Sequence, residues 1–462
     1  MIAQALRKLR IVRKCVPDHI LLFSTAPGAH KDMPAIEAEQ PRRLFTANYI
    51  LILATNFLLY FVDYAMMLWT TAWAIRHFNA DVSIAGLASG LFIVGALIAR
   101  IPMGRFIDFI GRRRTFVLGA AIYLVTSPLY LVCPNVWILC LLRLAHGFGF
   151  GTASTAASTV VASIIPLSRM GTGIGYFTLG LTFASAVGPF IAMNLDAQGF
   201  YEAVVWISTA TATLVLVMSL IIRCPERQIL PSEKEKLFKV SVGDFFERRA
   251  VPISTIALLG GICYSSVLSY IGAYSSFRGV TGIGATCFFV VFAAMTVLSR
   301  PFAGWLIDHR GGNVTIVPAL LCVALSMCVM AVASSDALFL LAAALLGYGY
   351  GTITAGCHAL AVHISPLHRI GVGTSTYFVF LDGGVGVGPY FLGLFVDHIG
   401  FQSIYIISAA IAVLAIAFFY WALLRKGLFT RSHMERTSKA KMLRQQRRNR
   451  SLKAAAQEAP AD

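Results

Sequence analysis

Twelve long apolar segments recur along this chain, and they constrain its fold more than any other feature. Hydrophobic residues make up 57% of the 462 residues, and charged residues make up only 13%. A helix needs roughly 20 apolar residues to cross the hydrocarbon core of a bilayer. The sequence therefore predicts an all-α membrane protein with twelve transmembrane helices. We place them at 47–74, 83–103, 115–133, 136–163, 172–194, 201–222, 252–274, 283–303, 314–333, 337–364, 372–394 and 402–424.

A polar, glycine-rich segment between the second and third spans returns in the second half of the chain. The first copy is 100–114 and the second is 300–312, so equivalent residues lie 200 positions apart. The glycine-rich runs 147–151 and 347–351 repeat at the same offset. A repeat of this kind indicates two related membrane units, and it predicts two pseudo-symmetric six-helix bundles.

The net charge of +17 follows the predicted topology. Of the 38 Lys and Arg residues, 33 lie in the two terminal segments and in the loops of one side of the predicted spans. Because cytoplasmic loops carry an excess of positive charge, this side is expected to be cytoplasmic, with both termini there. We therefore expect a multi-pass protein of the cell's inner (plasma) membrane. The charge then needs no nucleic-acid partner to explain it.

The spans divide the chain into five parts. We expect an N-terminal bundle at 45–222 and a C-terminal bundle at 251–424, joined by a cytoplasmic linker at 223–250. The segment 1–44 precedes the bundles, and we favour a translation start at Met33 within it. The tail 425–462 is basic and poor in apolar residues, so we expect it to be disordered and attracted to anionic lipid heads.

The repeated segment resembles a signature of the major facilitator superfamily, a large family of secondary transporters. That signature reads roughly G-x-L-x-D-R-x-G-R-R/K, and Phe109 stands where the family usually has Arg. The resemblance extends over about 45–425. It implies the major facilitator fold, with a central cavity that opens alternately to each side, and it implies a latch that steadies one conformation. The latch residues would be Gly104, Asp108, Gly111 and Arg112, with Gly304 and Asp308 in the second copy.

Asp63 and Arg143 are the first candidates for proton coupling. Asp63 lies near the middle of an apolar span, where a carboxylate costs several kcal/mol unless it is paired, hydrated or protonated. Arg143 precedes a glycine-rich run, as in a second signature of the same family. The rise along a helix places the two side chains at similar depths, so they could meet. Two interpretations stay open, namely a proton-coupling pair and a fixed ion pair that holds the first and fourth spans together.

Asp382 is a second acid near the middle of a span, and its equivalent in the first half is Thr182. Arg143 is equally asymmetric, because position 343 is Ala. Asp382 can be a second proton site, a group that binds a cationic substrate, or a hydrogen-bonded structural acid.

Polar and aromatic side chains in the spans could line a cavity, although core packing explains each one equally well. The tentative cavity residues are Asn56, Tyr60, Tyr270, Tyr274, Tyr348 and His358. Two Gly-Pro pairs predict close packing and helix kinks. The span 172–194, with Gly180 and the pair Gly188-Pro189, resembles a third signature, which marks the antiporter branches of the family, but Ala184, Ala192 and Met193 replace further glycines of that pattern. The pair Gly388-Pro389 repeats Gly188-Pro189 at the offset of 200.

The resemblance implies a proton-coupled secondary transporter working by alternating access. We expect it to export a drug or metabolite by proton antiport. The alternative is a proton symporter that imports a small metabolite such as a sugar or organic acid, and a non-transporting membrane sensor is a third interpretation. The sequence contains no nucleophile–base pair, metal cluster or phosphate-binding loop, so we expect neither an enzyme nor a cofactor or metal. The expected partners are a small-molecule substrate, protons and the lipid bilayer, with the protein a monomer.

Overall fold

The structure is a computed structural model that describes residues 44–457, apart from 81, 228, 230–241 and 281–282. The prediction of a start at Met33 lies outside the described residues. Twelve helices of the described part are long and apolar enough to cross a membrane. This finding confirms the predicted fold class and the twelve spans.

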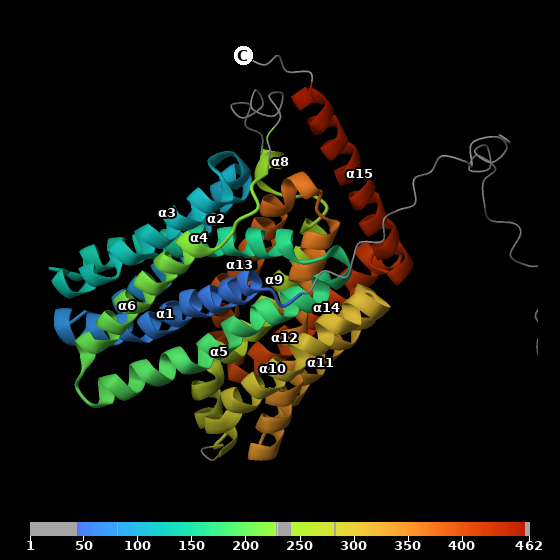
Figure 1. Cartoon of the computed structure of the whole chain (residues 1–462). Coiled ribbons are helices and arrows are strands. Elements are labelled where there is room, and N and C mark those ends of the chain that lie inside the picture. The colour runs from blue at the N-terminus through green and yellow to red at the C-terminus, as the bar shows by residue number, and fades with distance from the viewer. Residues whose placement is uncertain (1–43, 81, 228, 230–241, 281–282, 458–462) are drawn as a thin grey trace, which may run out of the picture. The chain divides into compact units, whose positions relative to one another are not determined.

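The first six spanning helices belong to the first half of the chain, and Figure 1 shows α1 beside α5. Short 3₁₀ segments at Pro128–Val132 and Leu167–Arg169 connect some of them. The helices are α1 (Ala47–Phe78), α2 (Val82–Ile110), α3 (Arg112–Thr126), α4 (Val136–Ile164), α5 (Met170–Ala197) and α6 (Tyr201–Ile221).

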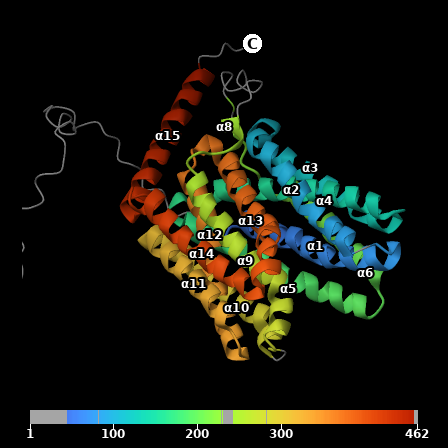
Figure 2. The same ribbon diagram turned by 180° about the vertical axis from the view of Figure 1, so that it is seen from behind.

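The second half repeats this order, and α9 packs on α13 as α1 packs on α5 (Figure 2). A 3₁₀ turn, η5, spans Leu367–Arg369 and a π-helical turn spans Tyr420–Leu424. In the linker only a short helix, α8 (Val242–Phe245), is described. The spanning helices are α9 (Val251–Phe277), α10 (Ile283–Arg310), α11 (Gly312–Val332), α12 (Asp336–Ile364), α13 (Ile370–Ile399) and α14 (Phe401–Phe419).

The repeated polar segment is mostly helical, although the predicted spans end at 103 and 303. Helix α2 continues to Ile110 and α10 continues to Arg310, so each runs past its predicted end by about two turns. The chain reverses at a single glycine, Gly111 with φ of 99° or Gly311 with φ of 93°. These φ values favour glycine, because it has no Cβ. The apolar pattern marks only the part of a helix inside the bilayer, whereas the polar continuation follows backbone hydrogen bonds.

Each half has its own hydrophobic core. Close helix packing is achieved in the same way in both. A Cβ at Gly147 of α4 would overlap the carbonyl oxygen of Phe92 of α2, and one at Gly347 of α12 would overlap that of Phe292 of α10. Glycine at these positions therefore lets the two helix backbones touch, and the repeated glycine runs reflect a repeated contact.

The tail that we expected to be disordered forms a helix, α15 (Arg431–Gln457), drawn in red in Figure 1. The backbone N–H of Gly312 donates to the Phe429 carbonyl at 2.9 Å and anchors the start of the tail. Lys441 is buried and donates to the carbonyls of Val362 and His363, in the last turn of α12. Charge density led us to expect disorder, but these contacts fold the segment.

Candidate functional site

The two halves meet at one side of the membrane domain, where the helix ends border the segments 104–114, 165–171, 304–313 and 365–371. We call this side the basic face. Here α2 packs against α13, and α5 packs against α10. A Cβ at Gly304 would lie 2.5 Å from the Gly171 carbonyl oxygen, and one at Gly104 would overlap Ser375. Two of the predicted latch glycines, Gly104 and Gly304, therefore lie where helices of opposite halves touch, whereas Gly111 lies beside Glu226 of the linker. These contacts close the structure toward the basic face.

Asp308 joins the halves directly. Its carboxylate accepts hydrogen bonds from the backbone N–H groups of Gly171 and Thr172, both at 2.8 Å, and from the Thr172 hydroxyl at 2.7 Å. These donors belong to the first turn of α5, where N–H groups lack partners inside the helix and the helix dipole favours a negative charge. An acid of the second half thus caps a helix of the first.

Asp108 has a different role from its twin. It accepts from Arg112 Nε at 2.9 Å within its own half, and Arg227 of the linker lies 3.5 Å away. Arg227 also donates to the carbonyl of His368, in η5 of the second half, at 3.3 Å. The Asp108 contact with the second half therefore passes through the linker.

The linker supplies residues that the sequence did not single out. Glu226 accepts from the backbone N–H groups of Arg112 at 2.8 Å and Arg113 at 2.9 Å, so it caps α3. Asp244 pairs with Arg105 of α2 at 2.8 Å, and Glu247 pairs with Arg369 at 2.7 Å. The sequence shows these residues only as acids in a basic loop, and it does not indicate which residues they contact.

An ion pair between Arg100 and Asp382 joins the halves deeper in the structure. Arg100 Nη1 lies 2.5 Å from Asp382 Oδ2, with the arginine side chain 2% and the aspartate side chain 25% exposed. The Ser375 hydroxyl donates to the Arg100 carbonyl at 2.5 Å, and the guanidinium lies 4.5 Å from the Phe378 ring. The sequence did not indicate a partner for Asp382, and the structure provides one from α2. In the sequence, Arg100 could have been recognised by its charge inside a predicted span.

Asp63 and Arg143 lie near each other without forming an ion pair, as far as the described residues show. Arg143 is fully buried, donates to the Ser89 carbonyl at 3.4 Å and lies 4.5 Å from the Phe92 ring. Helix α2 thus holds the guanidinium toward itself. The charges that act on the Asp63 carboxyl are, in order of strength, Arg143, Asp382 and Arg100. The structure therefore brings all three predicted coupling residues, and Arg100, into one central charge cluster.

Three of the tentative cavity residues lie beside this cluster or support it. The Tyr60 ring packs edge-on against Phe150 at 5.0 Å, and Phe150 is also a neighbour of the Arg100 guanidinium. His358 stacks on Tyr377 at 4.8 Å. Asn56 donates to the Phe177 carbonyl at 3.1 Å and so links α1 to α5.

The other three tentative residues make contacts elsewhere. The Tyr270 hydroxyl donates to the Pro389 carbonyl at 2.6 Å, and the Tyr274 hydroxyl donates to the Met330 carbonyl at 2.7 Å. Tyr348 is part-buried and interacts with Cys322 of α11. Helix packing and backbone hydrogen bonds account for these positions.

The Gly-Pro pairs lie inside α5 and α13. A Cβ at Gly188 would lie 3.0 Å from the Phe61 carbonyl oxygen, and one at Gly388 would overlap the Ser265 hydroxyl. Each glycine therefore permits a close contact, with α1 in the first half and with α9 in the second. The prolines that follow lack a backbone donor and permit a kink there.

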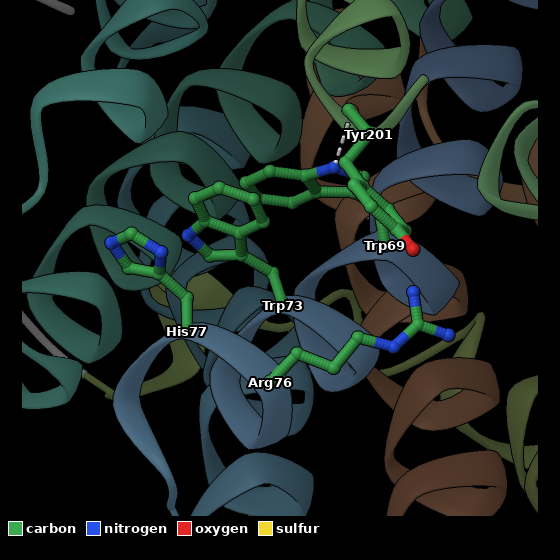
Figure 3. Close-up of a pocket in the computed structure, with 5 residues that line it drawn as sticks. All are labelled: Trp69, Trp73, Arg76, His77 and Tyr201. Atoms are coloured by element: carbon green, nitrogen blue, oxygen red, sulfur yellow. Dashed lines mark hydrogen bonds between the residues drawn. The ribbon is translucent and has the colours of Figure 1, made fainter. Parts of the chain in front are cut away.

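A separate hollow of about 240 Å³ lies at the end of α1 away from the basic face (Figure 3). Trp73 stacks between Trp69, at 5.0 Å, and His77, at 4.4 Å. Trp69 Nε1 donates to the Tyr201 carbonyl at 2.7 Å, and Arg76 lies 4.9 Å from the Tyr201 ring. Trp and Tyr gather at membrane–water interfaces, so this group anchors α1 to the start of α6 at that depth.

Comparison with known proteins agrees with this architecture. A Bacillus subtilis protein named as a niacin/nicotinamide transporter, NiaP, is 24% identical over 73% of this chain and 83% of its own length. An uncharacterised MFS-type transporter of Methanocaldococcus jannaschii is 23% identical over 71% of this chain and 86% of its own. The fold is similar to the crystal structure of the transporter FucP in its outward conformation, with a TM-score of 0.64, 17% identity, and coverage of 82% of this chain and 99% of FucP.

The sequence profile of the Major Facilitator Superfamily matches residues 52–336 and 288–456. Together the two matches span both halves, the repeated polar segments and the central charge cluster. The chain is a member of the Major Facilitator Superfamily of transporters.

Proposed function

We propose that this protein is a proton-coupled transporter that exports a small organic molecule by proton antiport. The observation that carries the proposal is the Arg100–Asp382 ion pair, which joins α2 to α13 across the two halves. An ionised Asp382 holds the halves together, and a protonated Asp382 gives up its charge attraction to Arg100. Protonation of one carboxyl thereby favours separation of the helices that close the basic face.

The direction of closure supports an order of events. By the positive-inside rule the basic face is cytoplasmic, so this arrangement is closed to the cytoplasm. A proton that reaches Asp382 from outside would weaken the closure and favour opening inward. In antiport the substrate then binds from the cytoplasm, the proton leaves there, and the reformed ion pair favours the outward arrangement.

Asp63 and Arg143 would form the second element of coupling. Arg143 is fully buried and its Nε and Nη1 have no hydrogen-bond partner among the described residues. An unpaired guanidinium beside a carboxylate favours the ionised acid, whereas burial favours the neutral acid. Small movements of α1 against α4 would then change how readily Asp63 takes up a proton.

Proton flux in proteoliposomes tests the proposal. The purified chain is reconstituted with a pH-sensitive dye inside, and cationic, neutral and anionic compounds are added in turn. We expect at least one compound to move protons in the opposite direction to itself, and Asp382→Asn to abolish that flux. The matched control Glu435→Gln changes an exposed carboxyl on α15 and should leave the flux unchanged. If no compound moves protons, or if Asp382→Asn behaves like the parent, the proposal fails.

Proton symport is the second candidate, and Arg300 favours it. This buried guanidinium has two nitrogens without hydrogen-bond partners in the described part of the chain, so it could hold an anion that enters together with a proton. The name of the Bacillus subtilis relative gives niacin/nicotinamide as its cargo. Protons and compound moving in the same direction in the flux experiment would replace antiport with symport.

A further inference from the structure

Arg300 is a buried cation whose hydrogen bonds are not satisfied. It is 3% exposed, in α10, and donates only one long hydrogen bond, at 3.4 Å to the Thr354 hydroxyl, among the residues described. Its Nε and Nη1 have no partner there. Buried charges are normally paired or fully hydrogen-bonded, because removing them from water costs free energy.

The twin residue Arg100 shows what completes such a site. Arg100 donates to the Ser154 hydroxyl at 3.4 Å, as Arg300 does to its equivalent Thr354. Arg100 also has the Asp382 carboxylate, whereas the residue 200 positions earlier than Asp382 is Thr182. The Thr182 hydroxyl is buried and likewise has no partner in the described structure.

The two arginines have equivalent backbone neighbours, so Arg100 and Arg300 correspond in structure as well as in sequence. Ser375 of α13 contacts the Arg100 carbonyl. Its equivalent, Gly175 of α5, lies so near the Arg300 carbonyl oxygen that an added Cβ would be 2.7 Å away. Asp382 and Thr182 each follow these contact residues by seven positions, which is two helical turns on the same face. Thr182 is therefore positioned toward Arg300 as Asp382 is toward Arg100.

Four tyrosine side chains lie within electrostatic range of this second arginine. The phenol groups that act on Arg300 electrostatically are those of Tyr377, Tyr350, Tyr64 and Tyr60. Tyr350 stacks on Tyr264 at 4.3 Å with an angle of 12° between the rings. Tyr64 and Tyr264 are equivalent residues of α1 and α9, and both are part-exposed. A flat apolar molecule can lie against such rings.

We propose that Arg300 binds the carboxylate of a small aromatic monocarboxylate substrate, with the Thr182 hydroxyl as a second donor and the Tyr264–Tyr350 stack against the ring. The guanidinium fork matches the two oxygens of a carboxylate. A single cation and one hydroxyl fit a singly charged group better than a phosphate, which carries more charge. The proposal rests on the proposed transport function, because it names the substrate of the same site.

Direct binding to the purified full chain tests the proposal without relying on proton flux. Isothermal titration compares benzoate with its neutral analogue benzamide and its cationic analogue benzylamine. We expect benzoate to bind and the two analogues to bind at least about 10-fold more weakly, since only the carboxylate takes charge-assisted hydrogen bonds. Cyclohexanecarboxylate, which has the same charge but no aromatic ring, should bind more weakly than benzoate.

Two substitutions of Thr182 that differ only in charge locate the site. Thr182→Asp would give Arg300 a carboxylate partner within the protein, as Asp382 is for Arg100. Because this carboxylate competes with the ligand, we expect benzoate binding to weaken about 10- to 100-fold. Thr182→Asn is the uncharged counterpart of nearly the same size, and because it exchanges the hydroxyl donor for an amide donor it should weaken benzoate binding several-fold less than Thr182→Asp does. Should Thr182→Asp fail to fold, Arg300→Gln takes its place and should also remove benzoate binding.

The outcomes separate this proposal from the proposed function. Absence of benzoate binding at millimolar concentration overturns it, as does equal binding to Thr182→Asp and Thr182→Asn or unchanged binding to Arg300→Gln. If cations move protons while carboxylates do not bind, proton coupling stands and the carboxylate proposal falls. If benzoate binds as expected but moves no protons in any variant, the substrate class stands and proton coupling falls.

Discussion

Positions 100 and 300 place the same side chain in two electrical environments. Both arginines are buried, and both donate to a hydroxyl of a neighbouring helix, α4 for Arg100 and α12 for Arg300. Only Arg100 has a carboxylate partner in the described structure. The difference depends on one residue, Asp382 or Thr182, at equivalent positions. At the scale of the residue, function thus arises where an otherwise repeated architecture departs from its repeat.

Asp382→Asn should destabilise the protein, whereas Thr182→Asp should stabilise it. The first leaves Arg100 buried without its counter-charge, and the second supplies Arg300 with one. Breaking a fully buried pair costs about 3–5 kcal/mol, and since Asp382 is 25% exposed we expect about 2 kcal/mol. Thermal unfolding in detergent at neutral pH measures both changes.

Glu435→Gln, on the exposed Arg431–Glu435 pair, is the reference and should change stability by no more than about 0.5 kcal/mol. A rise in unfolding temperature for Asp382→Asn, or a fall for Thr182→Asp, would show that the two arginine sites are not equivalent.

Among the elements, the helix α15 and the linker connect the basic ends of both halves. Helix α15 contacts α10 and α12 of the second half and the 3₁₀ turn Leu167–Arg169 of the first. Lys441 donates to carbonyls at the end of α12, where the helix dipole favours a positive charge. Burial, with a smaller contribution from the charge of Arg249, lowers the Lys441 pKa to about 8.

The docking of α15 should strengthen as pH rises from about 8 to about 10. A free lysine has a pKa of about 10.4, so in this window the docked helix binds fewer protons than the undocked helix. Linkage then makes docking more favourable at higher pH, by about 2 kcal/mol between pH 7 and 9.5. Hydrogen exchange of residues 431–444, corrected for intrinsic rates, measures the docking.

Lys441→Met removes the titrating group and should make the corrected protection independent of pH in this window. Protection in the parent that stays flat, or that falls as pH rises, would mean that Lys441 does not control docking.

For the whole molecule, the contacts between the halves are related by the repeat but are not the same. Asp308 reaches across to α5 with three hydrogen bonds. Its twin Asp108 pairs with Arg112 of its own half and, among the described residues, reaches the second half only through Arg227. The closed arrangement toward the basic face should therefore depend more on the second copy of the signature than on the first.

Asp308→Asn should open the basic face more than Asp108→Asn does. Loss of the charge at Asp308 weakens three hydrogen bonds across the halves, and we expect about 2 kcal/mol, or about 30-fold in the population of the closed state. Spin labels at the exposed positions 114 and 310, in a variant without native cysteines, report the distance between halves. An equal effect of the two substitutions would show that both copies of the signature contribute equally to closure of the basic face.

The sequence was sufficient for the features that repeat and insufficient for contacts between the repeats. Apolar segment length predicted the twelve helices, and the offset of 200 residues predicted the duplicated polar segment. The Arg100–Asp382 pair joins residues 282 positions apart, and no local pattern relates them. The helix α15 was missed because its composition is strongly basic, while the contacts that fold it belong to α10, α12 and the 3₁₀ turn Leu167–Arg169. The sequence placed Asp63 and Arg143 at similar depths. Depth alone could not show that the Arg143 guanidinium lies against the Phe92 ring and donates to the Ser89 carbonyl.

The charge of Arg300, which has no carboxylate partner in the part of the chain that the structure describes, also has a consequence for the membrane voltage. It lies ten residues from the basic end of α10, or roughly 15 Å along the helix from that end. One full charge crossing a potential of 100 mV changes the free energy by about 2.3 kcal/mol. An empty transporter that moves Arg300 partway through the field is therefore sensitive to voltage, and a bound carboxylate cancels that sensitivity. Energised and de-energised membranes should then differ in how fast the unloaded protein changes conformation, and less in how fast the loaded protein does.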